Sequence, residues 1–66
     1  MKRIKVTSLT GPYGTIFESL RIERERGIVG QVFDGPDELG YYMAFFPSVP
    51  DGKGLEVHRS MITFVR

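Results

Sequence analysis

The stretch Arg24–Gly35, RERGIVGQVFDG, combines strand-forming residues with three glycines. Its β-branched and aromatic residues predict a strand over Ile28–Phe33. A glycine inside a strand marks a bulge, a sharp bend or the close approach of another backbone. We therefore expect Gly27 and Gly30 to bend this strand so that a short chain can close on itself. Gly35 then serves the following turn.

Short apolar or alternating segments on both sides of this stretch predict further strands. They are Ile4–Thr7, Tyr41–Phe46, Leu55–His58 and Met61–Val65, with Gly- and Pro-rich turns between them. Short strands at about ten-residue spacing are typical of a sandwich or barrel, and closing the sheet removes exposed edges. We therefore expect residues 1–66 to form one small, all-β domain, a five- or six-stranded barrel.

The segment Thr15–Arg26 allows two interpretations. Thr15-x-x-Glu18 matches a capping box, which begins a helix. Leu20 and Ile22 alternate with charged residues, which favours a strand. We expect a loop or a short helical turn first, followed by a strand through Leu20 and Ile22. The charged stretch that follows, Glu23–Arg26, is expected to be solvated in either case.

Composition excludes several classes of protein. The chain has 66 residues, no Cys and one His, which rules out disulfides and thiolate zinc sites and argues against a histidine metal site. Hydrophobic residues make up 41% and charged residues 26%, as in a folded domain. No apolar h-region follows the basic N-terminus, and Tyr41–Pro47 is too short to span a bilayer. We expect a soluble, cytoplasmic protein without a membrane segment.

Several pieces of the chain follow one another in a recognisable order: Ile4-Lys5-Val6, Gly11–Gly14, the Gly-x-x-Gly-x-Val of Gly27–Val32, the apolar strand Tyr42–Phe46, a strand near Val57 and the closing stretch Met61–Val65. This order resembles the Src-homology-3-like small barrels, and more narrowly the KOW-type modules. A KOW motif runs its two glycine elements almost together. Here Thr15–Arg26 separates them, as in the long first loop of Src-homology-3-like barrels. The resemblance implies such a barrel, with room for a helical turn in its first loop.

The aromatic run Tyr41–Phe46 supplies the candidate protein-binding residues. Alternate residues of a strand face opposite sides. One face would carry Tyr42, Ala44 and Phe46, and the other Tyr41, Met43 and Phe45. Exposed aromatic residues and Met are enriched at protein interfaces, so we predict a protein-binding face of Tyr41, Met43 and Phe45. The alternative is that the barrel and its long loop bury both faces. A second copy of the chain is one partner able to cover the surplus face.

Uneven charge predicts a second kind of surface. Residues 1–33 carry six basic and three acidic side chains, whereas residues 34–57 carry five acidic and one basic. In such barrels the first and last strands lie near each other, which would bring Arg59 and Arg66 to the N-terminal cations. Cations of this kind attract phosphates, and an exposed Tyr13 or Tyr41 would stack on bases. The candidate nucleic-acid-binding residues are Lys2, Arg3, Lys5, Arg24 and Arg26. A net charge of +1 argues against a dedicated binder, and uneven charge is also common on ordinary surfaces.

Little in the sequence points to catalysis. His58 and Ser60 are close in sequence, but that spacing makes no triad, and Gly27-x-x-Gly30 lacks the Lys-Ser/Thr pair of a phosphate loop. Asp34–Glu38 has the composition of a turn, or of an acidic surface that docks a basic partner. We therefore expect no cofactor, no metal and no enzyme. The favoured function is a protein-interaction or regulatory subunit that docks on a larger complex. A KOW-like module that binds RNA or DNA comes second, and an enzyme with an active site at the centre of an oligomer last.

Overall fold

Five antiparallel strands and one short helix make up the computed structural model, which describes residues 1–66. The strands are β1 (Lys2–Val6), β2 (Gly30–Val32), β3 (Tyr41–Phe45), β4 (Gly54–His58) and β5 (Ile62–Val65), and the helix is α1 (Arg21–Arg26). Turns of 3₁₀ helix lie at Pro12–Gly14, Glu18–Leu20, Pro50–Gly52 and Arg59–Met61. No helix is both long and apolar enough to cross a lipid bilayer. The prediction of a small, mainly β fold is confirmed.

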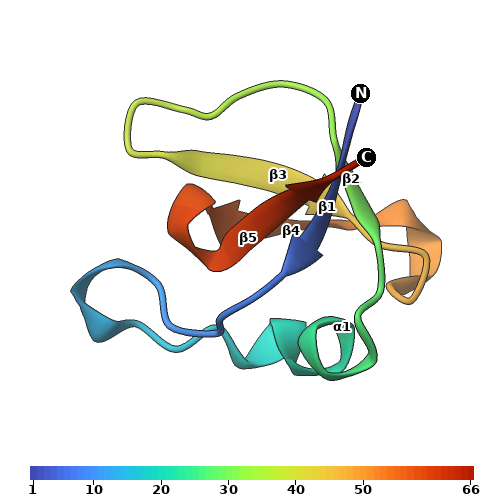
Figure 1. Cartoon of the computed structure of the whole chain (residues 1–66), viewed down its shortest axis with the longest axis horizontal. Helices are drawn as coiled ribbons and strands as arrows, with labels where there is room; N and C mark the ends of the chain where they lie inside the picture. Colours follow the sequence, from blue (N-terminus) through green and yellow to red (C-terminus); the bar gives the residue numbers. More distant parts are fainter.

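The strands form one sheet in the order β4-β3-β2-β1-β5 (Figure 1). The last strand returns to pair with the first, with Arg3 opposite Val65, so the two ends of the chain lie side by side (Figure 1). The predicted proximity of the first and last strands is therefore confirmed. The aromatic strand pairs with β2 as expected, with Val32 opposite Ala44. β4 and β5 are the two edges of the sheet.

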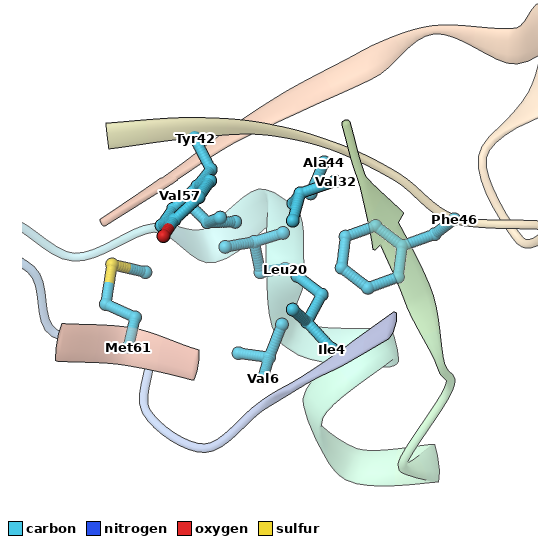
Figure 2. Close-up of a cluster of buried hydrophobic side chains, with 9 residues drawn as sticks. All are labelled: Ile4, Val6, Leu20, Val32, Tyr42, Ala44, Phe46, Val57 and Met61. Atoms are coloured by element: carbon cyan, nitrogen blue, oxygen red, sulfur yellow. The ribbon is translucent and has the colours of Figure 1, made fainter. Parts of the chain in front are cut away.

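One face of the sheet holds the hydrophobic core. Alternate residues of a strand share a face, and the buried positions of β1 and β3 follow that period. The core cluster is Ile4, Val6, Leu20, Val32, Tyr42, Ala44, Phe46, Val57 and Met61 (Figure 2). Burial of each large aliphatic side chain contributes about 1.5–3 kcal/mol. No buried side-chain nitrogen or oxygen lacks a hydrogen-bond partner.

The long segment between β1 and β2 is helical where we expected a strand. Leu20 is fully buried and lies at the centre of the core cluster (Figure 2), whereas Ile22 is 53% exposed. In a strand these two residues would share one face. The helical turn instead places Leu20 and Glu23, three residues apart, on the inward side. The predicted strand is wrong because alternation over so few residues does not separate the two periods.

Two glutamates of this segment act differently from the sequence prediction. Glu18 does not complete a capping box with Thr15. Its carboxylate accepts a hydrogen bond of 2.8 Å from Arg21 Nε, and this bond with its charge attraction raises the pKa of Arg21. Glu23 is buried rather than solvated, and its Oε2 accepts a hydrogen bond of 2.5 Å from Ser48 Oγ. That bond ties α1 to the loop between β3 and β4.

The glycines of the opening stretch have structural roles, but different ones. Gly27 adopts the left-handed conformation with φ of 62° and ends α1. Gly30 is the first residue of β2, and a β-carbon there would lie 2.5 Å from Phe46 Cε1. The predicted bend at Gly27 inside a strand is therefore wrong, because β2 begins only at Gly30. Close approach, the alternative meaning of a strand glycine, explains Gly30.

Candidate functional site

The face of the sheet opposite the core, here called the outer face, carries large apolar side chains. The alternation predicted for the aromatic strand is present: Tyr42 and Ala44 are buried, while Met43 and Phe45 point outward. Met43 is 50% exposed and Phe45 is 36% exposed. The alternative that both faces of β3 are buried is therefore wrong.

Phe33 joins these two residues and was missing from the predicted set. It is 58% exposed, and its ring packs edge-on against Phe45 with 5.9 Å between the ring centroids. We call Phe33, Met43 and Phe45 the apolar patch. Alternation with the buried Val32 places Phe33 on the outer face, beside Gln31. Its place next to Phe45 follows from the register in which Gln31 is opposite Phe45, and the sequence of one segment does not show that register.

Gly54 on β4 lies beneath two side chains of the apolar patch. It lies opposite Phe45, and a β-carbon there would stand 2.5 Å from Met43 Sδ and 3.2 Å from Phe45 Cε1. Both side chains therefore lie over the backbone of Gly54. The absence of a side chain at this position leaves room for both Met43 and Phe45.

Tyr41 belongs mainly to a different part of the surface. It is half-buried, and its ring centroid lies 5.0 Å from that of His58 and 6.5 Å from that of Phe17. It helps to line an open hollow of about 340 Å³ between two loops, together with Pro12, Tyr13, Leu39 and His58. Tyr41 is therefore not part of the outward-facing pair Met43 and Phe45, although it lines a second hollow together with Met43.

That second hollow has an acidic rim. It measures about 290 Å³ and is lined by Asp34, Gly35, Pro36, Asp37, Tyr41, Tyr42, Met43 and Glu56. Asp37 Oδ1 accepts hydrogen bonds of 2.9 Å from the backbone N–H groups of Leu39 and Tyr41, so this carboxylate organises the loop. Asp34 and Glu56 are exposed and form no ion pair within the chain. The expected turn at Asp34–Glu38 thus also presents free negative charge beside the apolar patch.

The five predicted basic residues do not form one cluster. Arg3 and Lys5 share the outer face of β1, because they alternate with buried Ile4 and Val6. Lys2 lies on the other side, with Nζ 5.4 Å from the centre of the Phe64 ring. Arg24 Nε donates to the Thr7 carbonyl oxygen at 3.2 Å, near the end of β1. Arg26 is exposed in the last turn of α1.

The side chain of His58 caps the 3₁₀ turn Arg59–Met61. Its Nδ1 accepts a hydrogen bond of 3.2 Å from the Ser60 backbone N–H, which begins the 3₁₀ turn Arg59–Met61. The proton is therefore assigned to Nε2, which donates to the Leu39 carbonyl oxygen at 3.0 Å. Ser60 Oγ lies 2.8 Å from the same Nδ1. Both ring nitrogens are engaged in structural bonds, and no group of His, Asp and Glu has the arrangement of a metal site.

Strand pairing orders the outer face by charge. One row of partners runs from Arg3 through Gln31 and Phe45 to Gly54, and in the next row Met43 is opposite Glu56. Cations therefore lie on β1, the apolar patch in the middle, and an acidic residue on β4.

No protein-family model, curated protein or solved structure matches this chain.

Proposed function

We propose that the chain is a small, non-enzymatic, cytoplasmic protein-interaction module that docks on a protein partner through the apolar patch. The observation that supports this is the presence of three large apolar side chains on the outer face, each at least 36% exposed, with the rings of Phe33 and Phe45 packed edge-on. The core cluster lies on the opposite face and contains none of these three side chains, so they are left available for a partner. Exposed patches of aromatic residues and Met with a polar rim are typical of protein interfaces.

The architecture fits such a module. We assign it to the Src-homology-3-like small barrels, because β1 and β5 pair and a long first segment separates β1 from β2. The helix within that segment sets the chain apart from a KOW motif, in which the two glycine elements nearly meet. This assignment favours a protein ligand over RNA.

The test compares capture of partners by variants of the patch. Phe33→Ser and Met43→Ser each remove apolar surface from the patch, while Ile22→Ser removes a similarly exposed apolar side chain from α1. Tagged proteins are incubated with nuclease-treated host lysate, and captured proteins are quantified. Loss of a partner with both patch variants, but not with Ile22→Ser, supports the proposal. Equal capture by all four folded proteins contradicts it.

Binding of nucleic acid is the second candidate, favoured by one observation. Arg3 and Lys5 lie on the outer face, and Arg3 is in the same row of strand partners as the exposed Phe45, with Gln31 between them. Cations beside an aromatic ring suit single-stranded nucleic acid. Gel-mobility shifts at low salt decide the matter, with Arg3→Glu as the matched variant. Retardation at micromolar protein that Arg3→Glu abolishes would favour this function over protein docking.

A further inference from the structure

We infer that the partner of the apolar patch is a second copy of this chain, packed face to face about a two-fold axis. This inference rests on the proposed docking function and names its ligand. The outer face of the sheet is self-complementary in charge, because it carries cations on one side of the patch and carboxylates on the other.

The charge order across the outer face supplies the complementarity. Arg3 and Lys5 flank the patch on the β1 side, and Glu56 flanks it on the β4 side. Asp34 lines the same hollow as Glu56 and Met43, so it adds negative charge at that end. None of these four residues has an ion-pair partner within the chain. Each is therefore free to pair with another molecule.

A two-fold axis brings opposite charges together. In an isologous dimer the same surface is used twice, so each contact occurs in two equivalent copies. We place the axis between the two outer faces, over the apolar patch and perpendicular to the line from Arg3 to Glu56. The two patches then meet at the centre of the interface. Arg3 of each copy then faces Glu56 of the other. A partner with uniform charge would match only one side of this face.

The size of the molecule permits such an interface. Its surface is 4560 Å², and a standard interface buries about 800 Å² on each partner, roughly a sixth of this total. The apolar patch supplies the centre of that area and the charged strands supply its rim, which is the usual arrangement of interfaces. Because the patch is small and the charged rim is exposed to solvent, we expect weak association. Half of the chains should be dimeric at a total protein concentration of about 1–100 µM.

Sedimentation equilibrium over a range of concentrations tests the dimer. The apparent mass is expected to rise from the 7.5 kDa of one chain toward twice that value. Phe33→Ser and Met43→Ser should keep the protein monomeric, while Ile22→Ser should not. A monomer at all concentrations up to about 1 mM, well above the expected range, overturns the inference. If lysate capture then still depends on the patch, protein docking stands with another partner, and if it does not, both proposals fall.

Charge reversal tests the symmetry. Arg3→Glu places two carboxylates opposite each other in both symmetric contacts, and Glu56→Arg does the same with two cations. Each variant alone should dimerise about tenfold more weakly, because like charges then face each other. A mixture of the two variants restores an opposite pair at both contacts and should regain the wild-type affinity. If the mixture is as weak as either variant alone, the arrangement is wrong. This comparison needs no change to the patch, so it stays decisive if the serine variants fail to fold.

Discussion

The ring of Phe46 lies so close to the α-carbon of Gly30 that a β-carbon on residue 30 would stand 2.5 Å from Phe46 Cε1. Phe46 is 4% exposed and belongs to the core, so the ring has no free space to move into. Gly30 therefore fixes the distance between the start of β2 and the end of β3. The close approach of these two residues is the physical reason for a glycine in this strand.

Replacing Gly30 should destabilise the fold. We expect Gly30→Ala to lower the free energy of unfolding by about 1–3 kcal/mol, because the new methyl group overpacks the core, and Gly30→Val to cost more. Urea denaturation measures the change. Phe46→Leu in the same chain should relieve part of the clash, so the two substitutions should be non-additive. Strictly additive effects would show that the two residues are not in contact.

Leu20 and Ile22 distinguish a helix from a strand in the first loop. Leu20→Ala should cost about 2–5 kcal/mol, because it empties a fully buried site, whereas Ile22→Ala should cost no more than about 0.5 kcal/mol. Thermal or chemical unfolding of the two variants gives the comparison. Similar large losses for both residues would mean that they share a buried face, as in a strand.

The bond between Glu23 and Ser48 predicts an unusual effect of a serine on stability. Ser48→Ala leaves the buried carboxylate of Glu23 without its side-chain partner, which should cost about 1–3 kcal/mol. Glu25→Ala is the control, since Glu25 lies on the exposed side of α1 and should change stability by no more than about 0.5 kcal/mol. A Ser48→Ala variant as stable as the wild type would show that this hydrogen bond does not contribute to the free energy of unfolding.

Gly54 should affect binding more than stability. A β-carbon there would stand 2.5 Å from Met43 Sδ and 2.6 Å from its Cγ, and this half-exposed side chain can rotate toward solvent. We expect Gly54→Ala to lower the free energy of unfolding by less than about 1 kcal/mol and to weaken docking clearly, because Met43 no longer lies flat. Parallel measurement of unfolding and of self-association separates the two effects. Unchanged association with a displaced Met43 would exclude this side chain from the interface.

The strands could be predicted from the sequence because they alternate. Segments such as Ile4–Thr7 and Leu55–His58 carry a two-residue period, which one buried face imposes. The helix α1 could not be predicted in the same way. Its six residues include one large apolar side chain, Ile22, and that side chain faces solvent. Burial of Leu20 and Glu23 through contacts distant in sequence decides the helical form of this segment.

The candidate site could be predicted in part. Alternation within Tyr41–Phe46 placed Met43 and Phe45 on one face, but it could not show that Tyr41 turns toward Phe17 and His58. Those contacts depend on where the loops lie. Phe33 was missed because its contact with Phe45 depends on the register between β2 and β3. The register between two strands cannot be read from the sequence of either strand alone.

The most direct test of docking through the apolar patch uses the three methionines as reporters. Met43 lies in the patch, Met61 is fully buried in the core, and Met1 is exposed at the chain end. With ¹³C-labelled methionine methyl groups, NMR spectra are recorded from about 10 µM to about 1 mM protein, and again with any protein captured from lysate. Docking through the apolar patch predicts that the Met43 signal shifts on binding while the Met61 signal stays in place. A Met43 signal that stays unchanged under both conditions would contradict it.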